Sequence, residues 1–258
     1  MNRLLVANWK MNPDSPREAR TLIAATKKAA QSLRRTEIVL CPPAIFLPLV
    51  APSRRVTLGG QDISTELRGA FTGSISAPMV KYSGATYTII GHSERRYPSS
   101  AFSNGIGETN EMINKKIKVA LGQGLRVILC VGERERDEQG KYLGLIRISL
   151  EQAVQRLPKV AANRLIIAYE PIWAIGGSAE KADTPADFLE QAIFIRKVLS
   201  HWCGQALALK LPVLYGGSVN PKNITAFIIQ GAADGFLVGH ESLQLDHWRE
   251  IIQLVDQC

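Results

Sequence analysis

Eight short apolar runs recur along the chain, and most of them are almost continuously apolar instead of alternating with polar residues. Strands that are covered on both faces, as in parallel sheets, have this pattern. We therefore expect eight strands, at residues 4–8, 37–41, 56–61, 86–91, 126–131, 164–169, 212–215 and 235–239.

Helical patterns fill the intervals between these runs. Ser15-Pro16-Arg17-Glu18 is a capping box with proline at the first helical position, which predicts a helix that continues to about Leu33. Thr184-Pro185-Ala186-Asp187 predicts another helix start of the same kind, and Asn220-Pro221 a further one. Apolar residues spaced over 112–121 predict a helix that ends at the following glycines.

Strand and helix alternate eight times without a linker or a shift in composition. This order predicts an α/β fold in which residues 1–258 form a single domain, a (β/α)8 barrel. A doubly wound open sheet is the alternative, but eight strands in a chain of this length favour the closed barrel.

Composition narrows the class of protein. The chain of 258 residues is 46% hydrophobic and 21% charged, which excludes a mainly disordered protein. Its net charge of +8 is dispersed along the sequence without a basic stripe, so we expect no nucleic-acid partner. It has no apolar stretch of about 20 residues and no apolar leader, so we expect a cytoplasmic protein without a membrane segment.

Two further features have an ordinary structural interpretation. The four cysteines, at 41, 130, 203 and 258, form no CxxC pair, which indicates reduced residues of the core. The charged run at 133–141 is typical of a solvated helix start.

Polar residues collect where the predicted strands end, and this is the end of a barrel that carries chemistry. A carboxylate that removes a proton next to a carbonyl needs an electrophile for the developing enolate oxygen, and an imidazole and an ammonium group serve this purpose. Backbone N–H groups in glycine turns hold phosphate. This chemistry needs no metal or cofactor, and we expect none. The residues in question are Asn8, Lys10, His92, Glu170, Gly216-Gly217-Ser218 and Gly239.

Longer motifs across the whole chain resemble the triosephosphate isomerase family, in the order that the family has them. They are Asn8-Trp9-Lys10-Met11-Asn12, Gly69-Ala70-Phe71-Thr72-Gly73, Gly91-His92-Ser93-Glu94-Arg95-Arg96, Cys130-Val131-Gly132-Glu133, Ala168-Tyr169-Glu170-Pro171-Ile172-Trp173-Ala174-Ile175-Gly176 and Tyr215-Gly216-Gly217-Ser218-Val219.

The resemblance implies a TIM barrel that interconverts dihydroxyacetone phosphate and D-glyceraldehyde 3-phosphate in glycolysis and gluconeogenesis. It implies that Glu170 is the base, and that His92 is the electrophile, kept neutral by a helix N-terminus, as is standard for this family. Lys10 would stabilise the anionic substrate and transition state, with Asn8 beside it. Phosphate contacts would come from Gly176, Ser218 and Gly239.

The resemblance also implies two larger structural features. A lid would begin at residues 171–176 and exclude water from the enediolate, with Ile175 and Leu237 on the apolar sides of Glu170. The loop with Thr72 and Gly73 would insert into a second subunit, which implies a homodimer.

The chain departs from the family pattern at four places. His240 replaces the second glycine of the last phosphate turn, the lid after Gly176 is about two residues longer, residues 97–105 look like an insertion, and Ser74 replaces a common glutamate. The altered lid and turn leave open an isomerase of a longer sugar phosphate, such as a tetrulose phosphate.

Two competing hypotheses belong to different classes of protein. A barrel that has lost catalysis would bind phosphate compounds without turnover, but intact Asn8, Lys10, His92 and Glu170 argue against it. A protein that binds nucleic acid through its net charge would show steep salt dependence, but no motif supports it.

Overall fold

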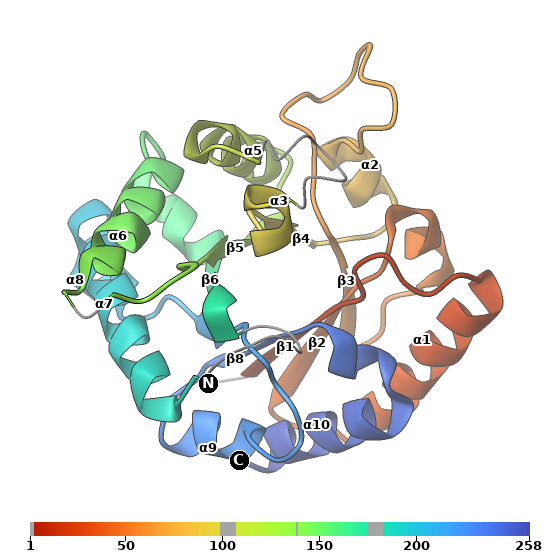
Figure 1. Ribbon diagram of the computed structural model, residues 1–258. Helices are drawn as coiled ribbons and strands as arrows, with labels where there is room; N and C mark the ends of the chain where they lie inside the picture. The colour runs from red at the N-terminus through yellow and green to blue at the C-terminus, as the bar shows by residue number, and fades with distance from the viewer. Residues whose placement is uncertain (1–2, 99–106, 138, 175–182) are drawn as a thin grey trace.

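The computed structural model describes residues 3–98, 107–137, 139–174 and 183–258, and within them eight parallel strands close into a barrel (Figure 1). Each strand pairs with its neighbour in sequence, and β1 pairs with β8, which excludes the open sheet. Every predicted strand is confirmed to within one residue at each end. The strands are β1 (Arg3–Asn8), β2 (Thr36–Cys41), β3 (Val56–Gly60), β4 (Tyr87–Ile90), β5 (Arg126–Val131), β6 (Leu165–Tyr169), β7 (Val213–Tyr215) and β8 (Gly235–Val238).

Helices surround the barrel (Figure 1). The main ones are α1 (Pro16–Ala30), α2 (Ala77–Tyr82), α3 (Ser93–Arg96), α5 (Asn110–Gly122), α6 (Lys141–Ala153), α7 (Pro185–Cys203), α8 (Gln205–Ala208), α9 (Ile224–Ile229) and α10 (Leu245–Gln257). Short 3-10 helices are η1 (Ala44–Leu49), η2 (Lys159–Arg164), η3 (Ile172–Ala174) and η4 (His240–Leu243).

The predicted helix starts are confirmed at two of the three capped positions. Ser15 and Thr184 cap α1 and α7, each accepting a hydrogen bond from the third residue along. The start at Asn220-Pro221 is wrong. The Asn220 side chain accepts the N–H groups of Lys222 and Asn223 in a turn, so the helix begins only at Ile224.

The buried core has two layers. Side chains such as Val6, Val39, Ile128 and Leu214 fill the inside of the barrel. A larger layer packs the outer side of the strands against the helices. Within this layer the Tyr215 and Phe227 rings stack at 3.9 Å between centroids, and Phe188 packs against both. Aromatic packing therefore fixes the end of β7.

The interpretation of residues 133–141 as a solvated helix start is wrong for Glu133. This side chain is buried, and its Oε1 accepts hydrogen bonds from Arg136 (2.9 Å), the Tyr169 hydroxyl (2.7 Å) and the Trp173 indole (2.9 Å). Helix α6 starts at Lys141, after this network. The sequence prediction failed because the partners of Glu133 come from other elements.

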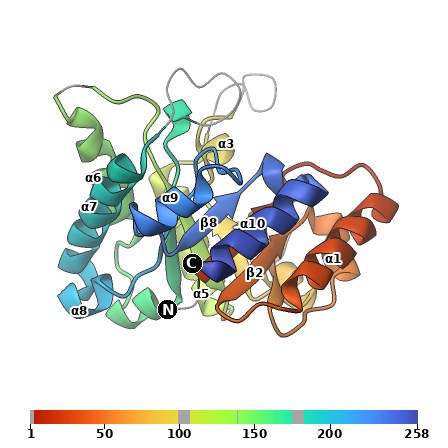
Figure 2. The same ribbon diagram turned by 90° about the horizontal axis from the view of Figure 1, so that it is seen from below.

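Because all strands are parallel, their carboxyl ends form one mouth of the barrel. Figure 1 looks into this mouth, and Figure 2 shows α3 at the mouth end and the N-terminus at the opposite end. The loop between β3 and α2 projects beyond the ring of helices (Figure 1). No helix of the described residues has the length and apolarity that crossing a membrane requires.

Candidate active site

A cavity of about 500 Å³ opens at the mouth, and six of the seven predicted site residues line it. These six are Asn8, Lys10, His92, Glu170, Ser218 and Gly239. The seventh, Gly176, lies outside the described residues, as does Ile175. Closure of the barrel therefore gathers residues from the ends of five strands around one space.

Glu170 follows β6 and is only 2% exposed. Its N–H donates to the carbonyl oxygen of Val131 at 2.8 Å, which ties it to the end of β5. Its carboxylate has two contacts: Oε2 accepts the Ser93 N–H at 2.8 Å, and Oε1 lies 3.1 Å from Nε2 of His92. The carboxylate and the imidazole therefore face each other directly on the wall of the cavity.

Small residues make room for Glu170. A Cβ placed on Gly216 would lie 3.1 Å from Cγ of Glu170 and 3.6 Å from Cβ of Leu237. A Cβ on Gly132 would lie 1.8 Å from the Glu170 carbonyl oxygen. Glu170 and Leu237 therefore both border the space beside Gly216, and Gly132 is required by the close approach of two strand ends.

His92 caps α3 with its own side chain. Its Nδ1 accepts the Glu94 N–H at 3.2 Å, so this nitrogen carries a lone pair in that hydrogen bond. The ring then carries its proton on Nε2, the atom that faces Glu170. The imidazole is therefore oriented with a donor toward the cavity.

Lys10 has a backbone φ of 52°, in the left-handed region that residues other than glycine rarely adopt. Two hydrogen bonds hold it there: its N–H donates to Asn8 Oδ1 at 3.1 Å, and the Gln61 amide donates to its carbonyl oxygen at 2.8 Å. Its Nζ contacts Glu94 Oε1 at 2.5 Å. The strained backbone thus carries the ammonium group back over the mouth.

The two glycine turns are shaped by neighbours. A Cβ on Gly239 would lie 3.4 Å from Cε of Lys10, so this turn runs beside the lysine. A Cβ on Gly217 would lie 2.2 Å from the Tyr215 hydroxyl. Ser218 donates its hydroxyl to the carbonyl oxygen of Ala174 at 2.8 Å. Both turns therefore bring backbone close to the cavity.

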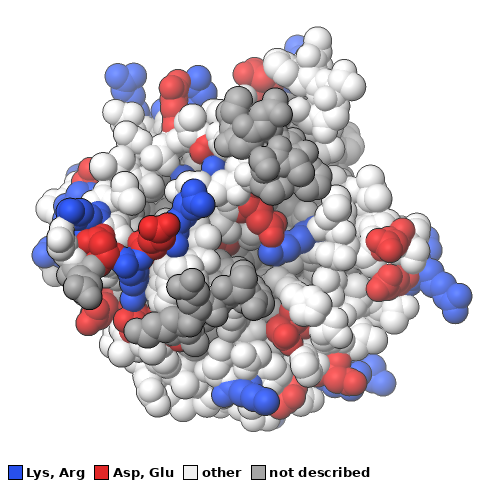
Figure 3. All heavy atoms as spheres, in the orientation of Figure 1, with Lys and Arg blue, Asp and Glu red and all other residues white. Residues whose placement is uncertain are grey.

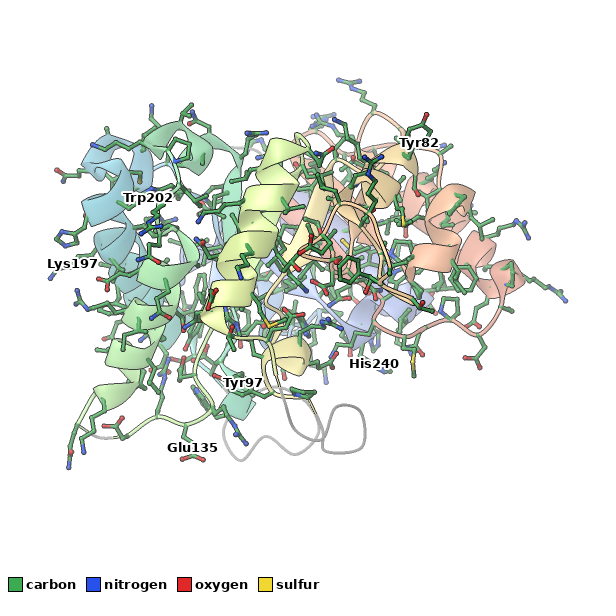
Figure 4. The ribbon with its side chains drawn as sticks, turned by 90° about the horizontal axis from the view of Figure 1, so that it is seen from above. Tyr82, Tyr97, Glu135, Lys197, Trp202 and His240 are labelled. Carbon is green, nitrogen blue, oxygen red and sulfur yellow. The ribbon has the colours of Figure 1, made fainter. Side chains whose placement is uncertain are left out.

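Two positions that depart from the family pattern, His240 and Tyr97, lie on the rim. Ser74 lies in the loop between β3 and α2, and residues 177–182 of the longer lid lie outside the described residues. His240 is exposed at the mouth, at the same end as Tyr97 (Figure 4), and both line the cavity. The backbone of His240 does not have positive φ, so a side chain fits there without strain. Of the predicted insertion, only Tyr97 and Pro98 lie within the described residues. Figure 3 shows both signs of charge interspersed around this face.

Sequence reasoning missed a supporting residue, Arg96. It is half-buried, and its guanidinium donates to the carbonyl oxygens of Gly91 (2.7 Å) and Cys130 (2.9 Å) and to the Asn110 side chain (2.7 Å). Burial lowers the pKa of Arg96. It joins β4, β5 and the start of α5 behind His92. An arginine in the short polar segment after Gly91-His92 was the available signal.

Cys130 lies in the barrel interior next to Glu170. Burial raises the pKa of its thiol well above the usual value, and the charge of Glu170 raises it further. The thiol therefore stays protonated. All four cysteines lie among the described residues, and none forms a disulfide.

A second buried network lies beside the cavity and was also missed. Arg136 donates to Glu133, to the Tyr169 hydroxyl at 2.8 Å and to Asp187 at 2.9 Å. Asp183 is 8% exposed, 3.8 Å from Arg136, and neither of its carboxylate oxygens has a hydrogen-bond partner among the described residues. Burial raises the pKa of Asp183 to about 7, although Arg136 lowers it.

Comparisons with known proteins all point to the same family. The family model described as triosephosphate isomerase matches residues 3–255. The chain is similar to proteins named triosephosphate isomerase from Dictyoglomus thermophilum (40% identity, 97% of this chain and 98% of that one) and Dehalococcoides mccartyi (41%, 97% and 96%). A protein of the same name from Thermus thermophilus is 40% identical over 98% of this chain and 99% of its own.

Proposed function

The chain belongs to the triosephosphate isomerase family, and from this premise we propose how the residues of its cavity carry out the reaction. The protein is an isomerase that interconverts dihydroxyacetone phosphate and D-glyceraldehyde 3-phosphate. The observation that supports our assignment of roles is the shared cavity, in which Glu170 lies 3.1 Å from Nε2 of His92 and Lys10 lines the same wall.

Glu170 is the base of the proposed mechanism. It removes a proton from the carbon next to the carbonyl, which leaves an enediolate, and returns the proton to the neighbouring carbon. The hydroxyl proton passes between the two substrate oxygens through Nε2 of His92, so that the carbonyl group changes place. In the structure its carboxylate contacts His92 and the Ser93 N–H. The substrate must therefore come between the carboxylate and the imidazole, and Glu170 must give up the Ser93 N–H to reach the carbon.

His92 and Lys10 stabilise the charge that develops on the enediolate oxygens. The Nε2 proton of His92 points into the cavity because Nδ1 accepts the Glu94 N–H. The Lys10 ammonium is partly exposed and is paired only with Glu94, an exposed carboxylate, among the described residues. Preoriented donors of this kind stabilise the developing negative charge more strongly in a cavity from which the substrate has displaced water.

The phosphate lies at the turns of Ser218 and Gly239, next to Lys10. Support comes from the close approach of Gly239 to the Lys10 side chain and from the position of both turns on the cavity wall. Asn8 fixes the backbone of Lys10 and is a further contact of the substrate region. Gly176 stays a predicted phosphate contact from the sequence.

A coupled assay of glyceraldehyde 3-phosphate isomerisation tests these roles. We expect Glu170→Gln to abolish turnover and Glu170→Asp to lower kcat about a hundredfold, because the shorter side chain withdraws the carboxylate. Lys10→Ala should raise KM and lower kcat. Near-normal kinetics of a folded Glu170→Asp protein would refute the assignment of the base. A four-carbon ketose phosphate in parallel measures whether His240 widens the substrate range.

We also propose a homodimer through the loop between β3 and α2. The Ser64 N–H donates to the Ile75 carbonyl oxygen at 2.7 Å and closes the base of this projecting loop, which contains Thr72 and Gly73. The loop exposes Phe71 to 50%, Leu67 to 45% and Ile75 to 37%. Apolar side chains that are exposed together on one projecting loop favour burial against a second copy.

Light scattering of Phe71→Asp tests the dimer. We expect the parent protein to be dimeric and this variant to be monomeric at micromolar concentration, because a carboxylate would be buried in the interface. Ile193→Asp, on the outer face of α7, is the matched control and should leave the dimer intact. A monomeric parent protein would refute the proposal.

Two further expectations from the sequence, on the domain and on the location of the protein, remain proposals. We propose that the whole of residues 1–258 forms the one domain. We propose a cytoplasmic location, which is supported by the three buried cysteines that remain free thiols.

A further inference from the structure

Basic residues gather at the end of the barrel opposite the cavity. Ten of the 31 Lys and Arg lie in the segments that lead into the strands or at the first residue of a strand, together with the acidic Glu37 and Asp234. With Asp256 at the end of α10 as a third acidic residue, these residues carry +7 of the net charge of +8. The ten, which we call the basic end, are Arg3, Arg34, Arg35, Arg54, Arg55, Arg126, Arg156, Lys159, Arg164 and Lys210. Nearly all of the net positive charge is therefore at one end of the molecule.

Topology places these residues together. Each one either begins a strand or lies in the segment that leads into one, and parallel strands begin at the same end of a barrel. In Figure 2 this end carries the N-terminus and faces away from α3. These residues are scattered along the sequence, and on that ground no nucleic-acid partner was expected, but the fold brings them to one end of the barrel.

The densest part of the basic end is at the amino ends of β1, β2 and β3. It consists of five arginines, Arg3, Arg34, Arg35, Arg54 and Arg55. The Arg3 N–H donates to the Arg35 carbonyl oxygen at 2.8 Å. The Arg55 guanidinium donates to the Arg34 carbonyl oxygen, and the Arg55 carbonyl oxygen accepts the N–H of Ile38 at the start of β2, at 2.8 Å. Strands in a sheet are about 5 Å apart, so these five charges share a compact area.

Among the described residues, the acidic residues at this end form no ion pair with the five arginines. Asp256 accepts the backbone N–H groups of Arg34 (3.0 Å) and Arg35 (2.8 Å). Asp234 pairs with Arg196 of α7 at 2.6 Å, a basic residue that is not one of the ten. The third, Glu37, accepts the Tyr87 hydroxyl. Within the described part of the chain, none of the ten forms an ion pair with a carboxylate. Two of the ten are held by other groups: Arg126 donates to the Tyr87 hydroxyl, and Arg164 donates to the carbonyl oxygen of Leu121 at 2.9 Å.

We propose that the basic end binds the phosphodiester backbone of nucleic acid without sequence preference. Eight of its ten residues are arginines, whose planar guanidinium groups match phosphate oxygens in a bidentate manner. The charges lie at the amino ends of six strands, β1, β2, β3, β5, β6 and β7. Charges spread in this way fit an extended polyanion better than a small anion. The cavity opens at the other end, so bound nucleic acid leaves it accessible.

An anionic membrane is the competing partner, since lipid headgroups also carry phosphate. Membrane surfaces favour apolar side chains among the cations. Among the described residues at this end, the large exposed apolar side chains are Tyr82 at the end of α2, Ile229 at the end of α9, Val160 and Leu209 (Figure 4 shows Tyr82). None of them lies in the segments that carry the five arginines. The arrangement therefore favours nucleic acid.

Counterion release sets the expected size of the effect. Non-specific binding of this kind has a Kd of about 1–100 µM at physiological salt, and each phosphate neutralised contributes about −0.9 to the slope of log K against log salt. Engagement of the five arginines therefore gives a slope of about −4 to −5.

Fluorescence anisotropy with a labelled DNA duplex of mixed sequence, titrated at several salt concentrations, tests the proposal. The variant Arg34→Gln/Arg35→Gln/Arg54→Gln should bind at least about tenfold more weakly, with a slope shallower by about 3. The control Arg17→Gln/Arg20→Gln/Arg249→Gln removes the same charge from α1 and α10 and should change Kd by less than about twofold.

The isomerase activity of all three proteins should be equal, which shows that each is folded and that the two functions are separable. Equal loss of affinity in both variants would show that only total charge matters, and would overturn the proposal. Absence of binding by the parent protein would overturn it too. So would binding to vesicles of phosphatidylserine and phosphatidylcholine without binding to the duplex.

Discussion

Replacement of Asp183 by asparagine should make the stability of the protein less dependent on pH. The carboxyl group of Asp183 is buried, and both of its oxygens are without hydrogen-bond partners among the described residues. The charged or titratable groups around it are Arg136, which is 3.8 Å away, and Asp187, Glu133 and Tyr215. Burial raises its pKa from 3.8 to about 7, so it is protonated in the folded protein at pH values where it is ionised in the unfolded chain.

The sign follows from proton linkage. Between about pH 4 and pH 7 the folded state binds more protons at Asp183 than the unfolded state, so the free energy of unfolding falls as the pH rises. The shift of about 3 pKa units corresponds to about 4 kcal/mol. Water that reaches the site screens this cost, and we expect about half of it, about 2 kcal/mol.

Urea unfolding at pH 4 and pH 8 measures the effect. The difference in free energy of unfolding between Asp183→Asn and the parent protein should be about 2 kcal/mol more favourable to the variant at pH 8 than at pH 4. This corresponds to about 5 °C in Tm. Asp187→Asn is the control in the same network. Its carboxylate accepts hydrogen bonds from Thr184 and Arg136, which hold its pKa below the usual value against the effect of burial, so its removal should not stabilise the protein at pH 8. A pH-independent difference for Asp183→Asn would refute the reasoning.

Three further changes have expected outcomes. Gly216→Ala places a Cβ 3.1 Å from Cγ of Glu170 and 3.1 Å from the carbonyl oxygen of Tyr169; it should lower kcat about tenfold in steady-state assays and lower the free energy of unfolding by about 1 kcal/mol. Arg96→Lys cannot reach all three acceptors and should cost about 2–3 kcal/mol in urea unfolding; a loss below the error of the fit would contradict this. His247→Ala frees the Glu241 carboxylate on the cavity rim from a 2.6 Å contact and should raise KM about threefold through repulsion of phosphate. Glu241→Ala/His247→Ala should restore KM, and failure to do so would exclude repulsion as the cause.

Much of the site was predictable because the family motifs are short and local. His92 is both the end of a strand turn and the cap of α3, and Glu170 follows β6 directly, so a linear pattern locates them. Glu133 was not predictable in this way. Its partners Tyr169 and Trp173 are 36 and 40 residues away, and only the pairing of β5 with β6 brings them together.

The sequence by itself determined the eight strands and their closure into a barrel. Runs of apolar residues with both faces covered specify buried parallel strands, and the helix caps at Ser15 and Thr184 act over three residues. These signals are local and therefore visible in a linear chain.

Only the tertiary structure decided which distant charges meet. The arginines of the basic end are far apart in sequence but lie at one end because every strand has the same direction. The high pKa of Asp183 likewise depends on the elements that bury it. Electrostatic interaction and desolvation act through space, so they become fixed only when the chain has folded.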